Sequence, residues 1–368
     1  MKVQLIEAIK IVLTTFIAST LIMFLMRKVA VHIGAIDKPR AAEGHRHIHK
    51  KATPKLGGVG IFLSFLLGYM LFGEQSVRMN SILIGSFIII LTSIVDDLKS
   101  IKASQKLIGH LVAASIIVFY GHILLDNITV FGYSFNFGIL SYPITILFIV
   151  ACTNIINLID GLDGLSGGIC SIFNITIAII GFFQGRFGSL VMVLTLIMLG
   201  STLGFLVHNF RPFHQAKIFA GDGATFMGFI ISIITLLEFK GPALISFFVP
   251  ISILSIPILD TLFAIIRRLL KGQPPFKADR EHLHHQLLGM NFSPTTTVLI
   301  IYGINILFAI ASILYTLKLQ EPIIARTIYI LLFIIVLWFV FHTTIISDKN
   351  PELLKKLSSK IKKNKKSN

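Results

Sequence analysis

Five aspartates stand at the ends of long apolar runs in this chain: Asp96, Asp97, Asp160, Asp163 and Asp222. Carboxylates beside such runs are costly to accommodate, and they usually serve function. Asp96 and Asp97 are adjacent, and adjacent carboxylates repel each other, which indicates a bound cation or a proton-transfer role. The alternative is a pair of exposed acids that are neutralised by Lys99 and Lys102.

The most informative stretch is Asn154–Gly164, in which two asparagines are followed by two Asp-Gly pairs. If the stretch is helical, steps of three residues place Asn154, Asn157, Asp160 and Asp163 near one face. Amide and carboxylate oxygens on one face suit Mg²⁺, sugar hydroxyls or the edge of a base. Hydrogen bonding between membrane helices is the alternative interpretation.

A glycine-flanked aspartate follows later in the chain, in Gly221-Asp222-Gly223. If it faces the same side as the other acids, Asp222 is a candidate third cation ligand. The alternative is an ordinary loop aspartate that caps the following helix.

A histidine-rich segment over residues 280–285 (Arg-Glu-His-Leu-His-His) follows a basic loop over residues 267–277. Three histidines within four residues, close to several Lys and Arg, could bind a pyrophosphate through charge-assisted hydrogen bonds. Zinc is a weaker interpretation because no other His or Cys pair has a recognisable spacing, and histidines without a role are the other alternative. The first basic loop adds a second such group: His45, His47, His49, Lys50 and Lys51. These could contact phosphate, although a topology signal accounts for most of their charge.

The elements that must position these residues are set by a strongly apolar composition. Of 368 residues, 54% are hydrophobic and 14% are charged, and the mean hydropathy is +0.84. A soluble fold has too little interior for so much apolar side chain, so the composition excludes soluble, disordered, collagen-like and disulfide-stapled classes and leaves a polytopic membrane protein. The net charge is +16, and the basic residues that produce it lie between the apolar runs. We therefore expect an anionic membrane surface or substrate, and no nucleic acid.

The apolar runs predict an all-α polytopic membrane protein with about eleven transmembrane helices, because about 20 apolar residues cross a bilayer. The predicted spans are 3–26, 56–73, 79–97, 104–121, 141–158, 165–182, 188–208, 223–238, 241–266, 294–317 and 322–346. One set of connections holds 26 of the 33 Lys and Arg residues, which assigns that side to the cytoplasm and places the N-terminus outside and the C-terminus inside. The first span lacks a small-residue cleavage site, so we expect it to stay as an anchor.

Outside the spans, alternating residues around a glycine over 128–137 predict one short extracytoplasmic hairpin. Residues 1–346 are expected to form a single integral-membrane catalytic domain, and residues 347–368 a basic cytoplasmic tail. The acids and the basic, histidine-rich rim then share a cytoplasm-facing cleft. Such a cleft suits Mg²⁺ with a phosphorylated soluble substrate, while a second substrate could arrive through the membrane.

Four motifs occur in an order that is typical of one family. They are Ser93–Asp97, Asn154–Gly164, Phe219–Asp222 and the segment Arg267–His285 with its His-x-His-His pattern. In these motifs the chain resembles the polyprenyl-phosphate N-acetylhexosamine-1-phosphate transferases, closest to the WecA/TagO branch of the MraY family, over about residues 30–340. The chain departs from the family pattern between Asp222 and Gly228, where it is one residue shorter, and over 39–46, where it is longer.

The resemblance implies transfer of GlcNAc-1-phosphate from UDP-GlcNAc to undecaprenyl phosphate, with release of UMP. It implies Mg²⁺ (or Mn²⁺) as cofactor and the bacterial cell (inner) membrane as location, with the active site on the cytoplasmic face. It also implies the first lipid-linked step of cell-envelope glycan synthesis, such as teichoic acid or O-antigen, and it leaves a homodimer open. The implied roles are catalysis for Asp96 and Asp97, metal binding for Asn157 and Asp222, and substrate binding for Lys106, Asn154, Asp160, Asp163, His282, His284 and His285.

Three other classes of membrane protein are alternatives. The phospho-N-acetylmuramoyl-pentapeptide transferases are the nearest alternative, and the His-x-His-His pattern argues against them. CDP-alcohol phosphatidyltransferases need an Ala-Arg soon after the first Asp-Gly, whereas Leu165-Ser166 follows Gly164 here. A membrane transporter would place ionisable residues at mid-membrane and show an internal repeat, for which Asp260 alone is weak support.

Overall fold

The structure is a computed structural model. It describes residues 2–37, 52–130, 133–212, 214–238, 254–270 and 282–317, and all but 329 and 333 between 327 and 339. The expected basic tail, the first basic loop over 38–51 and most of the basic loop before the histidines (271–281) lie outside the described residues.

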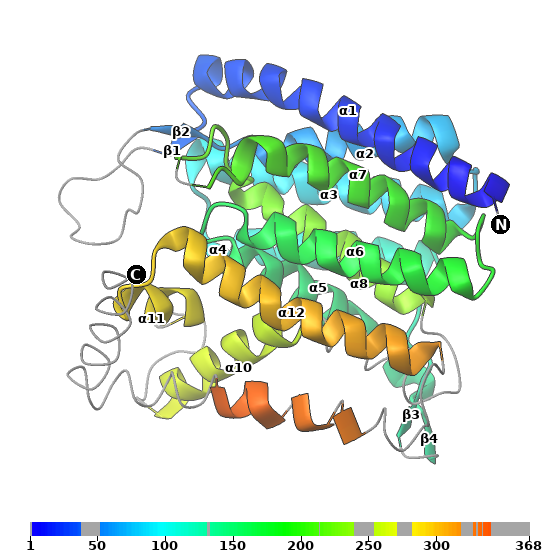
Figure 1. Cartoon of the computed structure of the whole chain (residues 1–368). Coiled ribbons are helices and arrows are strands. Elements are labelled where there is room, and N and C mark those ends of the chain that lie inside the picture. The colour runs from blue at the N-terminus through cyan, green and yellow to red at the C-terminus, as the bar shows by residue number, and fades with distance from the viewer. Residues whose placement is uncertain are drawn as a thin grey trace. The chain divides into compact units, whose positions relative to one another are not determined.

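Helices make up most of the described chain (Figure 1). Their bounds are α1 (Lys2–Ile33), α2 (Gly57–Phe72), α3 (Val77–Lys99), α4 (Ala103–Ser115), α5 (Ser141–Ile159), α6 (Leu165–Phe183), α7 (Leu190–Asn209), α8 (Ala224–Glu238), α10 (Ser255–Leu270), α11 (Leu283–Gly289) and α12 (Pro294–Thr316). A π-helical turn over Ile116–Tyr120 continues α4. Serine side chains cap three helices: the Oγ atoms of Ser76, Ser189 and Ser293 accept the backbone N–H three residues on, which begins α3, α7 and α12.

Eight of the helical segments are long and apolar enough to cross a membrane, and three more are apolar but shorter, namely Gly57–Phe72, Ser255–Ile266 and Ile330–Phe339. Each overlaps one of the eleven apolar runs predicted from the sequence, although Ser255–Ile266 covers only the second half of the run 241–266 and Ile330–Phe339 only the middle of 322–346. The predicted class, an all-α polytopic membrane protein, is thereby confirmed. The number of spans and their orientation stay predictions.

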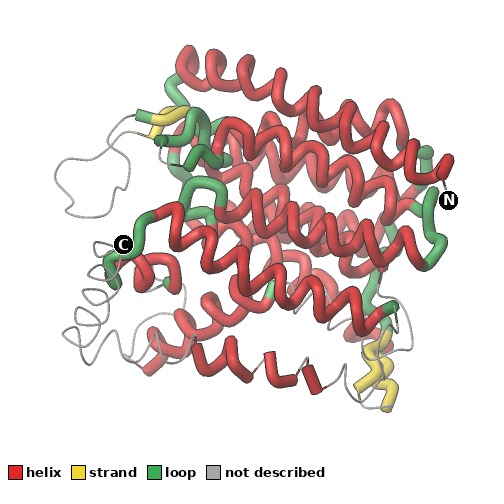
Figure 2. Tube along the Cα trace, viewed as in Figure 1, coloured by secondary structure: helices red, strands yellow, loops and turns green. Residues whose placement is uncertain are grey.

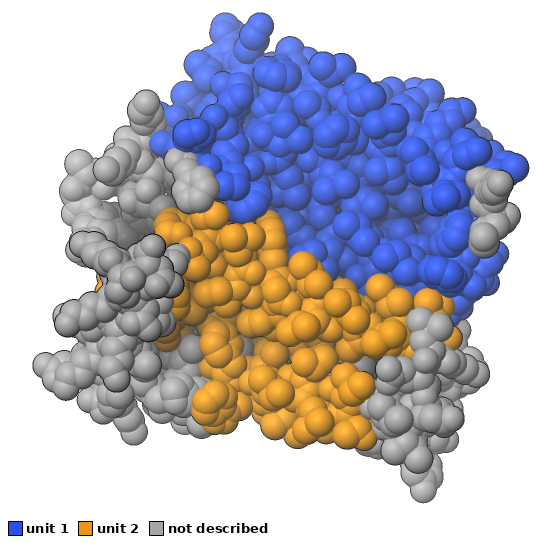
Figure 3. Space-filling view, viewed as in Figure 1, with its two compact units in different colours: residues 1–250 blue, residues 251–368 orange. Residues whose placement is uncertain are grey.

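The chain forms two compact units, residues 1–250 and 251–368 (Figure 3). In the first unit α7 lies between α1 and α6, and α8 packs against α5 and α3 (Figure 1). The segment Gly221–Glu238 is 89% buried over its most apolar window, whereas that of α1 is 28% buried. The residues just before α8, which include Asp222, therefore lie at the start of the most buried span of this unit. In the second unit α12 packs against α10 and α11.

Two short antiparallel ladders complete the first unit. β1 (Ile36–Asp37) pairs with β2 (Thr53–Pro54), and β3 (Asn127–Val130) pairs with β4 (Tyr133–Asn136). Figure 2 shows the two ladders at opposite ends of the helices. The β3–β4 hairpin is the one that the sequence predicted, and the β1–β2 pairing was not predicted.

Candidate active site

Lys106 in α4 joins two of the predicted acids. Its Nζ lies 2.5 Å from Oδ2 of Asp96 and 2.7 Å from Oδ1 of Asp222. Asp96 also accepts the N–H of Ile101 through its Oδ1 at 2.9 Å. Both oxygens of Asp96 are therefore engaged, and its partner is Lys106 rather than Lys99 or Lys102, the pairing considered as the alternative.

Of Lys106, Asp96 and Asp222, Asp222 is the most enclosed, with 7% of its surface exposed. Its Oδ1 accepts both Lys106 Nζ and the Nδ2 of Asn157, each at 2.7 Å. Its Oδ2 is buried and has no hydrogen-bond partner among the described residues. The alternative role as a helix cap does not hold, because the side chain points to Lys106 and Asn157.

Asp97 has a different partner from its neighbour. Its two oxygens lie 3.2 and 3.3 Å from the backbone nitrogen of Asp222, which donates to them. Gly221 has a φ of +65°, and a Cβ there would lie 2.5 Å from Asp97 Oδ2. A side chain at position 221 would therefore displace Asp97. Asp97 thus holds the turn that presents Asp222.

The turn that carries Asp222 is fixed from two further sides. The hydroxyls of Ser93 and Thr225 bond to the backbone carbonyl of Asp222 at 3.2 and 2.7 Å and to each other at 2.9 Å. The N–H groups of Gly57 and Gly58 donate to the carbonyls of residues 219 and 220 at 2.8 and 3.0 Å. These contacts hold Asp222 beside Lys106 and Asn157.

Asn154 lies one turn before Asn157 on α5. Its Nδ2 donates to the carbonyl of Val150 at 2.7 Å and lies 3.3 Å from Nδ1 of His110. His110 is 1% exposed, and its Nε2 has no hydrogen-bond partner among the described residues. His110 was missed by the sequence analysis because a lone histidine in an apolar run carries no motif. Ser93 and Thr225 were missed as partners because each acts only through a distant backbone.

The predicted helical stripe of four polar residues is wrong for its second half. α5 ends at Ile159, and Asp160 and Asp163 lie in the turn before α6. The chain leaves the helix at Asp160, whose ψ is +47°, and the turn ends at Gly164, which has a φ of +87° and donates its N–H to Oδ1 of Asn209 at 2.7 Å. Only Asn154 and Asn157 share the helical face.

Asp160 and Asp163 have their own partners in this turn. Asp160 accepts a short hydrogen bond from the Ser166 hydroxyl, and Asp163 Oδ2 accepts the N–H of Ala216 at 3.0 Å. Burial raises the pKa of Asp160 to about 7, because the Ser166 bond only partly offsets desolvation and the charge of Asp163 adds to it.

The predicted histidines lie in the second unit. The ring of His284 lies 5.9 Å from that of His282 and 4.2 Å from that of His285, centroid to centroid. Asp260 in α10 lies 3.0 Å from Nδ1 of His282 through its Oδ2, and it accepts the N–H of Leu283 through Oδ1 at 2.7 Å. Asp260 therefore holds the start of α11.

His284 is not suited to charge-assisted binding as the sequence suggested for the histidine group. Burial, together with the charges of His285 and His282, lowers its pKa to about 3. His284 is therefore neutral at physiological pH, and it would serve as a neutral hydrogen-bond partner.

The residues around Lys106 fit a Mg²⁺ ion. Mg²⁺ is commonly held by one or two carboxylates together with waters and substrate phosphates. Asp222 offers a buried oxygen without a partner, and the amide of Asn157 lies beside it. Within the described residues there is no group of three or more His, Cys, Asp or Glu that could hold a metal ion. The protein would therefore supply only part of the coordination shell.

Residues 79–238 match glycosyl transferase family 4. This range contains the residues that we call the Lys106 group, namely Asp96, Asp97, Lys106, Asn157 and Asp222. The chain belongs to this family of transferases, and it is a multi-pass membrane protein.

Three relatives cover most of the chain. A probable undecaprenyl-phosphate N-acetylglucosaminyl 1-phosphate transferase of Bacillus subtilis (strain 168) is 39% identical over 339 residues, which are 90% of each chain. A decaprenyl-phosphate N-acetylglucosaminephosphotransferase of Mycolicibacterium smegmatis is 30% identical over 75% of this chain and 74% of its own. An undecaprenyl-phosphate alpha-N-acetylglucosaminyl 1-phosphate transferase of Salmonella typhi is 28% identical over 79% of each chain.

Proposed function

We propose that this protein transfers GlcNAc-1-phosphate from UDP-GlcNAc to undecaprenyl phosphate. An oxygen of the lipid phosphate attacks the β-phosphorus of UDP-GlcNAc, and the bond from that phosphorus to the bridging oxygen breaks. The products are undecaprenyl-pyrophosphate-GlcNAc and UMP. The observation that carries the proposal is the Lys106 group within a chain whose relatives bear that activity in their names.

Lys106 is proposed to bind a reacting phosphate. Its ammonium lies between two carboxylates at 2.5 and 2.7 Å, so an incoming phosphate would exchange one carboxylate partner for a phosphate oxygen. Phosphoryl transfer depends mainly on positioning and on neutralising charge. A fixed cation in a partly buried site provides both.

Asp97 is proposed to be the base of the adjacent pair, where a proton must leave the lipid phosphate. Asp96 is ion-paired with Lys106 and bonded to the N–H of Ile101, so both of its oxygens are already engaged. Among the described residues, Asp97 receives one long backbone hydrogen bond, shared between its oxygens, from Asp222. The different roles proposed for Asp96 and Asp97 follow from their different partners.

Asp222 and Asn157 are proposed to hold Mg²⁺, with Mn²⁺ as a substitute. A bound divalent ion would neutralise charge on the pyrophosphate. Asp222 presents its buried Oδ2 for this purpose, and the turn over residues 219–223 keeps it in place. The turn with Asp160 and Asp163 is proposed to position the nucleotide sugar, and the histidines of α11 to contact its pyrophosphate or sugar.

The site is proposed to face the cytoplasm of a bacterial cell. The Lys106 group lies at the ends of α3 and α5 that precede the connections 98–106 and 159–164. The first of these connections contains Lys99, Lys102 and Lys106, and such charge favours the cytoplasmic side. UDP-GlcNAc is a soluble nucleotide sugar and would reach the site from there.

The test is a transfer assay with purified protein in detergent, undecaprenyl phosphate and radiolabelled UDP-GlcNAc, with Mg²⁺ or with EDTA. We expect label to move into the lipid phase and UMP to appear in equal amount, with Mg²⁺ only. Transfer from the muramoyl-pentapeptide nucleotide but not from UDP-GlcNAc would overturn the substrate. Equal transfer in EDTA would overturn the metal.

A further inference from the structure

A basic pocket lies at the end of α1, outside the Lys106 group. Its volume is about 1140 Å³, and it is lined by the last two turns of α1, by β2 and by the loop after α7. Six basic side chains line it: Arg27, Lys28, His32, Arg211, His214 and Lys217. Among the described residues that line it, none is an Asp or Glu. The pocket is therefore strongly positive. It shares no lining residue with the Lys106 group.

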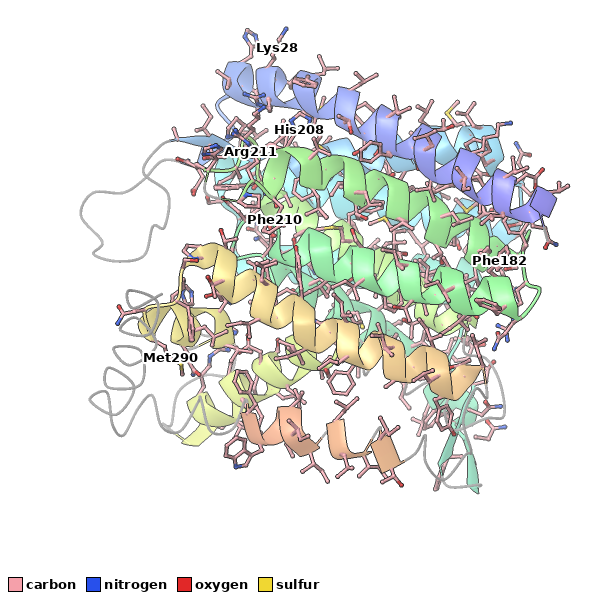
Figure 4. All side chains as sticks on the ribbon, in the orientation of Figure 1. Lys28, Phe182, His208, Phe210, Arg211 and Met290 are labelled. Carbon is pink, nitrogen blue, oxygen red and sulfur yellow. The ribbon has the colours of Figure 1, made fainter. Side chains whose placement is uncertain are left out.

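The basic side chains come from two segments that are far apart in sequence. Figure 4 labels Lys28 on α1 and Arg211 on the loop after α7, toward the same end of these helices. The loop is tied to β2 by the bond from Gln215 Nε2 to Thr53 Oγ1 at 2.7 Å, and to α7 by the bond from Lys217 N to the carbonyl of His208 at 2.9 Å. The fold thus gathers like charges that would otherwise repel each other, as an anion site requires.

One donor in the pocket has no partner among the described residues. The Nε of Arg27 is buried and makes no hydrogen bond within the described part of the chain. A buried donor without a partner is costly, and an anion in the pocket would relieve that cost. Guanidinium groups bind phosphate oxygens through charge-assisted hydrogen bonds.

The wall of the pocket is also partly apolar and exposed. Phe24 and Val31 line it and are 48% and 58% exposed. Along the same helix, Leu21 and Leu25 are 62% and 56% exposed. A helix that crosses a bilayer turns such side chains to lipid, and its end lies level with the headgroups. A lipid offers both a phosphate and an apolar chain to this wall, whereas free phosphate offers only the first.

We propose that this pocket binds the phosphate headgroup of an anionic membrane lipid. Arg27 and Lys217 supply the main charge, and the apolar face of α1 contacts the acyl chain. The pocket shares no lining residue with the Lys106 group, and lipid binding there does not depend on which sugar is transferred.

The test measures binding of fluorescent phosphatidylglycerol to the delipidated full-length protein in non-ionic detergent. The variant Arg27→Gln/Lys217→Gln removes two charges from the pocket, and Lys10→Gln/Lys99→Gln removes two charges elsewhere. Because a basic side chain near anionic lipid contributes about 1 kcal/mol, we expect roughly thirtyfold weaker binding for the first variant. We expect wild-type affinity for the second.

Competitors identify the source of the phosphate. Unlabelled phosphatidylglycerol should displace the probe, while phosphatidylcholine and inorganic phosphate should not. Displacement by inorganic phosphate at the same concentration as lipid would overturn the lipid assignment in favour of a soluble anion. Equal binding by the two double variants would overturn the site. Thermal unfolding of both variants without lipid checks that each is folded, and the transfer assay is read separately.

Discussion

At the scale of single residues, the site depends on which oxygen each acid has free. Asp96 uses both oxygens, on Lys106 and on the N–H of Ile101, whereas Asp222 keeps one buried oxygen without a partner within the described residues. Two acids of the same type therefore have different chemistry. The difference comes from Lys106, which lies between them.

Lys106→Gln should lower the transfer rate at least about a hundredfold, because removing one charged stabilising group from a preorganised site typically costs that much. It also leaves Asp96 and Asp222 without their shared cation. The measurement is the rate of UMP release under saturating substrates. Lys99→Gln, which removes an exposed charge on α3, is the matched control and should keep the wild-type rate. A Lys106→Gln rate within threefold of wild type would refute the role of the ammonium.

The protonation of Asp160 should appear in the pH dependence of stability. Its pKa is raised from 3.8 to about 7 in the folded protein, so the folded state holds the proton more tightly than the unfolded state does. The free energy of unfolding should therefore fall as the pH rises from about 4 to about 7. Asp160→Asn should flatten this part of the profile. Thermal unfolding in detergent at pH 5, 6.5 and 8 makes the comparison, and parallel profiles would contradict the assignment.

At the scale of elements, the site depends on a close approach between the start of α2 and the turn before α8. A Cβ on Gly58 would lie 2.3 Å from the Cα of Gly223, a collision of backbone with side chain that neither segment can avoid without moving. The Asp222 turn is the segment that would move. Position 58 therefore affects the site although it bears no functional group.

Gly58→Ala should cost about 2 kcal/mol of stability, the range typical of overpacking, and should also slow transfer. Gly303→Ala is the control, since it lies in α12 and a Cβ there meets no atom of the described chain within 4 Å. Thermal unfolding and the transfer assay should separate the two variants. Equal unfolding temperatures would show that the Gly58–Gly223 approach can relax.

At the scale of the whole molecule, the open question is which way the spans run. The positive-inside rule places the Lys99 loop in the cytoplasm and the β3–β4 hairpin outside. Asn136→Cys in the hairpin should react with a membrane-impermeant maleimide in intact cells, and Lys99→Cys only after permeabilisation. The two native cysteines are buried and should contribute little background. The opposite labelling pattern would invert the topology and move the site outside.

The sequence by itself determined the class of protein, the approximate positions of its helices and most of its acids. Apolar runs of about 20 residues have few other solutions, and Asp or Asn at their ends are conspicuous because they are costly there. The β3–β4 hairpin was also readable, since its alternation and its turn are local.

Only the tertiary structure decided how these residues are paired. The turn that carries Asp160 and Asp163 ends at Gly164, whose N–H bonds to Asn209, 45 residues further along the chain, and the contact of Lys106 with Asp222 spans 116 residues. The basic pocket likewise joins α1 to the loop after α7. Such pairings follow from packing between segments that are far apart in sequence. A local pattern of residue types does not indicate which distant segments will pack together.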